Sequence, residues 1–362
     1  MTAIINLAYD CGQGNGKLVG PHGWAILESY AARQRGEQVS GDLDGIRSKR
    51  ARHQITLENA QRFYVGRNAH SVGEPIEALD YDRYAGSPEQ RALFYGILTE
   101  YMQKHEVRLE RVRLTIGVPF QVLSGAEAER NVQAISGWLT GEHTWQADGE
   151  RYSLTITETR VKSQAAGALY QYMFDENGHI VRERKSTLIA PKKGGGVQFV
   201  PVGILSFGFL TVEAMAVEYQ KGDNGELELV KQDRFTSSRP MGLHRLLDVA
   251  RSGPELTLAE LDQQFRDGVL DTGDAMTIYQ RDVSGVLIDA WGRSGWKRFG
   301  VILLVGGGAV ALGDWLRGRF EGRAFLPESP ASANGHYRDG RGQDLMPILA
   351  IAMGLYREAM RS

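Results

Sequence analysis

Apolar and polar positions along the chain follow two periods, one typical of strands and one typical of helices. Short apolar runs at residues 3–10 and 111–120 end in glycine or proline and predict buried strands. Residues 87–107 carry apolar side chains at helical spacing, and Ser87 followed by Pro88 is a typical helix start. The alternation of such strands and helices favours an α/β fold.

The rest of the chain continues this alternation. Residues 22–31 fit a second strand or an early helix, and the polar stretch 34–52 predicts a loop. Further predicted elements are a strand and turn over 62–69, helices over 125–139, 163–174, 240–252, 257–268, 275–295 and 342–361, hairpins over 143–161, 175–179 and 202–219, and a strand, glycine turn and helix over 298–320.

Composition narrows the class of protein. A length of 362 residues predicts about two domains, and 42% hydrophobic with 24% charged residues is ordinary for a globular chain. The net charge of −2 gives no general attraction to nucleic acid or to anionic membranes, and the basic run 45–53 is interpreted as a solvated loop. One cysteine, Cys11, fits a reducing compartment.

No targeting or membrane segment is predicted. The first residues lack a signal-peptide pattern, and the apolar stretches 299–313 and 346–356 are too short or too interrupted by glycine to span a bilayer. We therefore expect a cytoplasmic protein without a membrane partner and without direct nucleic-acid binding.

Three apolar strands each lead into a glycine-containing turn, at Asp10–Lys17, Ser206–Thr211 and Gly306–Ala309. Glycine lets backbone amides approach a phosphate, and lysine adds a positive charge. Singly, each turn favours a structural role. Lys17 is followed by leucine and not by Ser or Thr, and the third turn lacks a G-x-G-x-x-G pattern. Their order along the chain is more informative than any one of them.

That order resembles the nucleotide loops of the actin and heat-shock chaperone ATPase superfamily: D-x-G-x-G-x-x-K early, a hairpin in mid-chain, and G-G-G-A late. The segments between them are similar to the bacterial actin-like proteins related to ParM, a plasmid-partition filament protein. The matching segments are YVGRNA at 64–69, TIGVPF at 115–120, SQAAGALY at 163–170 and, more weakly, ASANGHYRDG at 331–340.

This resemblance implies an actin-like fold, in which two ribonuclease-H-like domains flank a nucleotide cleft. The expected domain I comprises residues 1–170 plus 330–362, and the expected domain II comprises 171–329. The implied cofactors are ATP, or GTP, and Mg²⁺. The sequence does not choose between the two nucleotides.

The resemblance also assigns site residues. Asp10 would hold Mg²⁺ through water, a role that suits a cation that keeps its water ligands, and Gln164 would orient the attacking water; a local capping role for Gln164 stays open. The residues implied to bind nucleotide are Gly12, Gln13, Gly14, Asn15, Gly16 and Lys17 in the first turn, Ser206, Gly208, Phe209, Leu210 and Thr211 in the second, and Gly306, Gly307, Gly308 and Ala309 in the third, which would contact adenosine.

The second turn departs from the family pattern. Ser206 stands where the family has an aspartate that organises the metal, Phe209 where it has glycine, and Glu213 where it has a second aspartate. Serine can bind a metal-bound water but supplies no charge. We therefore expect nucleotide binding with slow hydrolysis, with Glu213 as a further candidate metal residue.

Three functions remain open on the sequence. The first is an ATP-dependent cytomotive filament, built by self-association and active in plasmid or other DNA segregation through a DNA-bound adaptor. The second is a small-molecule kinase of the same superfamily, which would need an aspartate base that no segment of the sequence indicates. The third is a nucleotide-gated scaffold that does not hydrolyse ATP, and Ser206 adds weight to it.

Overall fold

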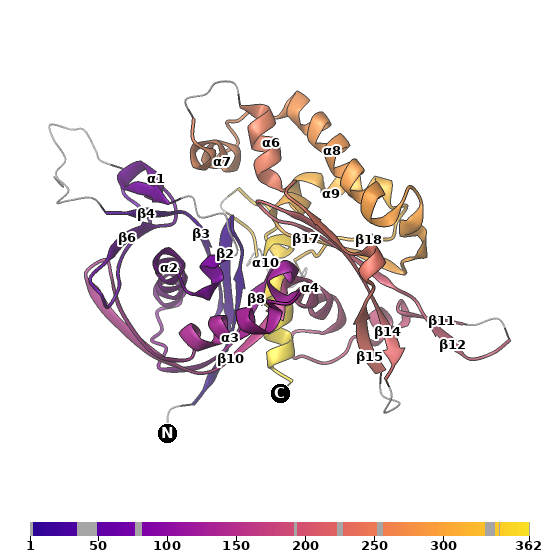
Figure 1. The fold of residues 1–362 in the computed structure, drawn as a ribbon, viewed down its shortest axis with the longest axis horizontal. Helices are drawn as coiled ribbons and strands as arrows, with labels where there is room; N and C mark the ends of the chain where they lie inside the picture. The colour runs from indigo at the N-terminus through magenta and orange to yellow at the C-terminus, as the bar shows by residue number, and fades with distance from the viewer. Residues whose placement is uncertain are drawn as a thin grey trace. The chain divides into compact units, whose positions relative to one another are not determined.

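The computed structural model divides into two compact units, residues 1–163 and 164–362 (Figure 1). It describes residues 3–34, 49–76, 82–191, 194–222, 227–251, 256–329, 337–339 and 341–361. Most of the predicted loop 34–52 and of the segment 331–340 lies outside these residues.

Unit 1 is built on a ten-stranded sheet with the order β3-β2-β1-β8-β10-β9-β5-β6-β4-β7 (Figure 1). Strands β1, β8 and β10 run parallel, and the other neighbours pair antiparallel. The strands are β1 (Ile5–Cys11), β2 (Asn15–Gly20), β3 (Gly23–Glu28), β4 (Ala31–Arg33), β5 (His53–Thr56), β6 (Arg62–Val65), β7 (Glu74–Ile76), β8 (Arg111–Val118), β9 (Gly141–Ala147) and β10 (Glu150–Ser163). The helices are α1 (Ala69–Val72), η1 (Asp82–Ala85), α2 (Pro88–Lys104), η2 (Phe120–Leu123) and α3 (Ala128–Leu139).

The long helix α2 forms much of the core of unit 1. It begins as the sequence predicts, because the Ser87 side chain accepts a hydrogen bond from the Gln90 amide and Pro88 occupies the first turn. The helix packs on strands β2, β3 and β5, and Phe94 and Ile97 are fully buried there. The rings of Phe94 and Tyr9 lie 5.4 Å apart, which ties the helix to β1.

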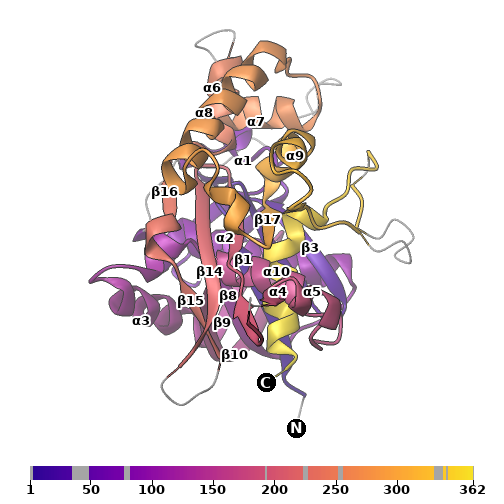
Figure 2. The ribbon, with the colours of Figure 1, turned by 90° about the vertical axis from the view of Figure 1, so that its right-hand side faces the viewer.

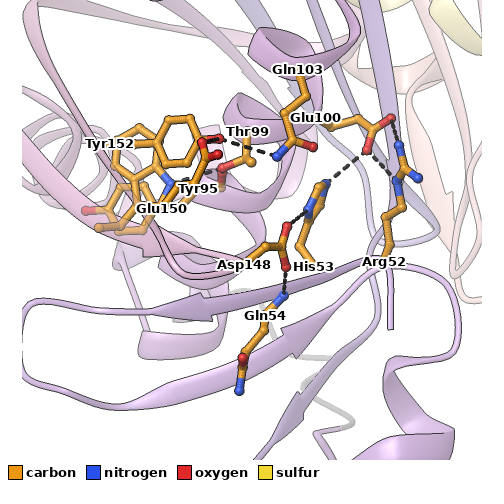
Figure 3. Close-up of polar contacts among 11 residues, drawn as sticks. Arg52, His53, Gln54, Tyr95, Thr99, Glu100, Gln103, Asp148, Glu150 and Tyr152 are labelled. Carbon is orange, nitrogen blue, oxygen red and sulfur yellow. Dashed lines mark hydrogen bonds and ion pairs between the residues drawn. The ribbon is translucent and has the colours of Figure 1, made fainter. Parts of the chain in front are cut away.

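An ionic cluster around the buried His53 joins three segments of unit 1 (Figure 3). His53, at the start of β5, is 2% exposed and lies between two carboxylates. Its Nδ1 is 2.7 Å from Asp148 Oδ2 in the β9–β10 turn, and its Nε2 is 3.0 Å from Glu100 Oε2 on α2. Arg52 donates to both oxygens of Glu100, and the Gln54 amide donates to Asp148. The cluster thus fixes β5 between the helix and the hairpin.

Unit 2 contains a second sheet with the order β15-β14-β13-β17-β18, to which β16 adds by pairing with β14. Its strands are β13 (Val202–Phe207), β14 (Val212–Lys221), β15 (Leu227–Lys231), β16 (Ser237–Arg239), β17 (Val301–Val305) and β18 (Ala324–Phe325), and β11 (Ile189–Pro191) with β12 (Val197–Phe199) forms a small separate pair. The helices are α4 (Gln164–Met173), α5 (Arg182–Ser186), η3 (Asp233–Phe235), α6 (Leu243–Ala250), α7 (Leu258–Arg266), α8 (Gly273–Trp291), η4 (Gly295–Arg298), α9 (Gly307–Arg319) and α10 (Met346–Ala359).

Helices cover both faces of this second sheet. Leu205 and Phe207 of β13 join the core formed with α6, α8 and α9. Helix α4 packs on β13 and β17, and α10 packs on β17. No described helix is both long and apolar enough to cross a membrane.

Helices α4 and α10 lie side by side (Figure 2). A Cβ atom on Gly354 would fall on the carbonyl of Gly167, and one on Gly167 would lie 2.6 Å from the Ile351 carbonyl. The glycines therefore allow the two backbones to touch. Both helices lie in the compact unit 164–362, and the expected domains, 1–170 plus 330–362 and 171–329, stay a prediction.

The two sheets share one topology. In each, three consecutive strands form an antiparallel meander whose first strand is central, and two later strands continue the sheet in parallel with it. The order β3-β2-β1-β8-β10 in unit 1 thus corresponds to β15-β14-β13-β17-β18 in unit 2. The β1–β2 turn and the β13–β14 turn therefore occupy equivalent positions.

Candidate functional site

The first glycine turn connects β1 to β2 through residues 12–14. Asp10 and Lys17 face each other across this hairpin, and the Lys17 Nζ lies 3.0 Å from Asp10 Oδ2. Both side chains are buried. The sequence predicted Lys17 as part of the turn, but it lies in strand β2, where it neutralises the Asp10 carboxylate.

In this turn the carbonyl oxygens of Gly12 and Gly14 accept hydrogen bonds, whereas two backbone amides donate none to the described residues. The Ser29 hydroxyl donates to the Gly12 carbonyl at 2.6 Å, and the Ser29 amide donates to the Gly14 carbonyl at 3.1 Å. The Gly12 amide binds the Asp10 carbonyl, whereas the Gln13 and Gly14 amides donate no hydrogen bond to any described residue. Uncommitted amides at a tight turn are suited to binding an anion.

Gly12 is required by close packing. A Cβ atom at this position would lie 2.6 Å from the Asn15 carbonyl oxygen and 2.7 Å from the Lys17 Nζ. Any larger residue would therefore open the turn or displace Lys17 from Asp10.

The turn lies at the carboxyl ends of parallel strands. Asp10 of β1 pairs with Gly117 of β8, which pairs with Lys162 of β10. Gln164 follows β10 directly and begins α4, and its side chain is buried. The carboxyl edge of parallel strands is where ligands of open α/β sheets usually bind, so the chain places Asp10 and the residue before Gln164 at one such edge.

The first turn is also held by two side chains that the sequence did not indicate, those of Tyr84 and Gln90. The Tyr84 hydroxyl donates to the Cys11 carbonyl at 3.2 Å, and Gln90 Nε2 lies 3.0 Å from Cys11 Sγ. Burial raises the pKa of the Cys11 thiol, so the group stays protonated. Tyr84, Gln90 and Ser29 are distant from the turn in sequence and belong to no recognisable motif, which is why pattern analysis missed them.

The second turn joins β13 to β14 through residues 208–211, as the sequence predicts. Ser206 and Glu213 face each other across the hairpin, and both are buried. The turn closes with a hydrogen bond from the Gly208 amide to the Thr211 carbonyl.

The carbonyls of this turn bind the start of helix α6. The amides of Leu243, His244 and Gly242 donate to Gly208, Phe209 and Leu210, respectively. These bonds satisfy amides that the first turn of a helix otherwise leaves without a partner. The second turn is therefore anchored to α6, as the first turn is anchored to Ser29.

The two turns match residue by residue. In each, four residues lie between the partners of the last strand pair, which is Cys11–Gly16 in the first hairpin and Phe207–Val212 in the second. Gly12 therefore corresponds to Gly208, and Asp10 to Ser206. The amides of Phe209 and Leu210, which correspond to Gln13 and Gly14, likewise donate no hydrogen bond within the described part of the chain.

The charges at the matching positions differ. The first turn carries an aspartate paired with a lysine, and the second carries Ser206 opposite Glu213. The second turn therefore keeps one carboxylate, on β14 instead of β13.

The third glycine turn adjoins the second. Ser206 of β13 pairs with Val305 of β17, so the carboxyl ends of these parallel strands meet. Gly306 has φ +95°, and a Cβ atom there would contact the Phe207 carbonyl. Helix α9 begins at Gly307, where a Cβ atom would meet no neighbour. The Gly306–Ala309 segment thus combines a left-handed backbone, an open position and a helix N-terminus, which favours anions.

The predicted site residues fall into two groups. Asp10 to Lys17 belong to unit 1, and Gln164 with the second and third turns belongs to unit 2. Among the described residues, no group of three or more His, Cys, Asp or Glu side chains could hold a metal ion directly. The predicted metal roles of Asp10 and Glu213 and the water-orienting role of Gln164 stay predictions.

Comparison with known proteins identifies the fold. Residues 8–167 match the family model of the actin-like proteins N-terminal domain. Comparison with curated protein sequences finds no match.

Solved structures resemble the chain over its whole length. A 15-stranded ParM filament from Clostridium botulinum has a TM-score of 0.69 at 17% identity and covers 99% of both chains. The archaeal actin homologue Ta0583 in complex with ADP has a TM-score of 0.65 at 15% identity, with 99% of this chain and 100% of that chain covered. Apo pSK41 ParM has a TM-score of 0.63 at 13% identity, with 98% and 97% covered. The predicted actin-like fold and the resemblance to ParM-related proteins are confirmed.

Proposed function

From its actin-like N-terminal domain and the actin-like fold of its whole length, we propose that this protein binds ATP, or GTP, with Mg²⁺ and assembles into filaments in response. The observation that carries the proposal is the pair of equivalent turns, each with two amides that donate no hydrogen bond to the described residues. The phosphate oxygens of a nucleoside triphosphate would accept hydrogen bonds from such amides. The similarity to a ParM filament and to an ADP-bound actin homologue supports both parts of the proposal.

The residues present are compatible with the nucleotide. Gln13 and Gly14 in the first turn and Phe209 and Leu210 in the second would donate amides to phosphate oxygens. The glycines of the third turn would allow the adenosine to approach the backbone, which the open space at Gly307 supports.

The metal would be held through water. Mg²⁺ keeps several waters, so Asp10 and Glu213 are suitable partners although neither belongs to a preformed cage. The metal would supply positive charge near the transferred phosphate. Gln164 would orient the attacking water, and Lys17 would balance the Asp10 charge.

We expect hydrolysis to be slow. Ser206 takes the place of a carboxylate, and Glu213 across the hairpin is the only carboxylate of this strand pair at that level. Positioning and charge dominate phosphoryl transfer, so a missing charge reduces the rate more than it reduces binding. A slowly hydrolysing enzyme, or a scaffold gated by nucleotide alone, follows from this substitution.

Self-association would give an open polymer. A contact between different faces of successive copies produces a filament when it does not close, and the net charge of −2 opposes such assembly only weakly. We place this filament in the cytoplasm, in the segregation of plasmid or other DNA through a DNA-bound adaptor.

Sedimentation and light scattering with ATP, with ADP and without nucleotide, each with Mg²⁺, test the proposal. We expect pelleting with ATP only. Gly12→Ala should abolish it because the new Cβ has no room, whereas Gly137→Ala, a site where a Cβ meets no neighbour, should leave it unchanged. A protein that stays in solution and consumes ATP only when an acceptor is added would be a kinase, and the filament proposal would then be wrong.

A further inference from the structure

The residue that shapes the first turn lies outside it. Ser29 follows β3 and reaches both ends of the turn, with its hydroxyl on the Gly12 carbonyl and its amide on the Gly14 carbonyl. The register of β2 and β3 pairs Asn15 with Glu28, so Ser29 extends this ladder by one residue.

These two bonds determine where the amides of the turn point. In a trans peptide the C=O and the N–H of one plane point in opposite directions. The Gly12 carbonyl shares its plane with the Gln13 amide, and the Gly14 carbonyl shares its plane with the Asn15 amide. By holding both carbonyls, Ser29 directs both amides away from itself.

Ser29 is itself fixed from the other side. The carbonyl of the next residue, Tyr30, accepts a hydrogen bond of 2.9 Å from the Gly66 amide. The Tyr30 ring packs edge-on against His70, with ring centroids 5.0 Å apart. These contacts of Tyr30 restrict the movement of the neighbouring Ser29. The hydrogen bonds of Ser29 therefore hold the turn in a fixed position relative to Gly66 and His70.

We propose that Ser29 is a positioning residue for phosphate binding, which through the Gly12 carbonyl holds the Gln13 amide in the orientation that an anion requires. It touches the turn and not the nucleotide. This inference rests on the proposed nucleotide function of the turn, but the shape of the turn is measurable without nucleotide.

The test compares Ser29→Thr with Ser29→Val, which have the same shape and differ by one hydroxyl. Backbone order parameters of Gln13 and Gly14 are measured by ¹⁵N relaxation in the nucleotide-free protein, and affinity is measured by titration with a fluorescent mant-ATP and Mg²⁺. We expect Ser29→Thr to behave as the wild type. Ser29→Val should lower the order parameters from about 0.85 towards 0.6 and weaken mant-ATP binding about five- to tenfold, the value of one hydrogen bond.

Ser124→Ala is the matched control, since it removes a serine hydroxyl that donates to the Gln121 carbonyl in the same unit, at 3.1 Å. It should change neither readout. Ser29→Ala replaces Ser29→Val if the latter does not fold.

Unchanged order and affinity in Ser29→Val, or equal losses in the Val and Thr variants, would overturn the inference. If the wild type binds no mant-ATP but Ser29→Val alone loosens the turn, the nucleotide proposal fails and the positioning of the turn by Ser29 stands.

Discussion

The buried histidine of the ionic cluster, His53, makes the stability of unit 1 depend on pH (Figure 3). Both ring nitrogens of His53 face carboxylate oxygens, which only accept hydrogen bonds, so both contacts are satisfied only by the doubly protonated ring. Burial alone would lower the pKa of His53, but the hydrogen bonds to Asp148 and Glu100 outweigh it and raise the pKa above 6.5. Burial would likewise raise the pKa of Glu100, yet the hydrogen bonds from His53 and Arg52 bring it to about 2.

The two groups stabilise unit 1 over different pH ranges. The contribution of His53, whose pKa is raised in the folded state, is fully present below about pH 6.5 and is lost as the pH rises through the raised value. The contribution of Glu100, whose pKa is lowered, is present above about pH 4.5 and is lost as the pH falls towards 2. Both are present together near pH 5.5.

The size of this stabilisation can be worked out from the lowered pKa of the Glu100 carboxylate. A pKa of about 2 instead of 4.5 corresponds to about 3 kcal/mol from all partners of Glu100 together. His53 is one of two such partners, and Arg52 and Asp148 are partly exposed, which weakens their contacts through solvent screening. We therefore expect His53→Gln to lower the free energy of unfolding by about 2 kcal/mol at pH 5.5 and by less than about 1 kcal/mol at pH 8.5.

Urea unfolding of wild type and variant at both pH values measures this difference, with hydrogen exchange of the 53–56 segment reporting locally on unit 1. His22→Gln, at an exposed histidine of the same unit, is the control and should leave the free energy of unfolding nearly unchanged in both urea experiments. An equal loss at pH 5.5 and pH 8.5 would show that His53 contributes by packing and not by charge.

Two further substitutions examine the turns of unit 2. Ser206→Asp should raise the rate of ATP hydrolysis several-fold, and without Mg²⁺ it should cost about 1–2 kcal/mol of stability because the new carboxylate faces Glu213. Phosphate release and thermal unfolding, each with and without Mg²⁺, measure the two effects. An unchanged rate of hydrolysis would show that Ser206 does not cause slow hydrolysis. Gly306→Ala should destabilise unit 2 by about 2–3 kcal/mol, since φ is +95° and the Cβ would contact the Phe207 carbonyl; Gly307→Ala, with open space at its Cβ, should be nearly neutral in the same thermal melts.

Most of the secondary structure could be predicted from local sequence patterns. The start of α2 at Ser87 and Pro88 and the turn at Asp148 and Gly149 were predictable because capping and turn residues act on their own neighbours. Residues 22–31, left between strand and helix, contain strand β3, whose pairing with β2 is a tertiary contact that no local pattern reveals.

The equivalence of the turns and the side chains that support them could not be predicted from the sequence, because both depend on contacts between residues far apart in the chain. The positions of the three glycine turns were visible, but their equivalence appears only once the register of each hairpin is known. Ser29 and Tyr84 support the first turn through side-chain contacts to backbone carbonyls, which leave no periodic signal in sequence. The close contact between α4 and α10 likewise depends on two glycines far apart in the chain, Gly167 and Gly354.

The contact between α4 and α10 also bears on the order in which the chain folds during synthesis. Every strand of the ten-stranded sheet comes from residues 5–163, so unit 1 can complete its core while the later part of the chain is still being made. Helix α4 is made next, but the surface that Gly167 presents is covered only when Gly354 arrives. Unit 2 must therefore leave this face of α4 without its helix partner while residues 174–353 are synthesised, and a mispaired α4 is the misfolding that we expect there.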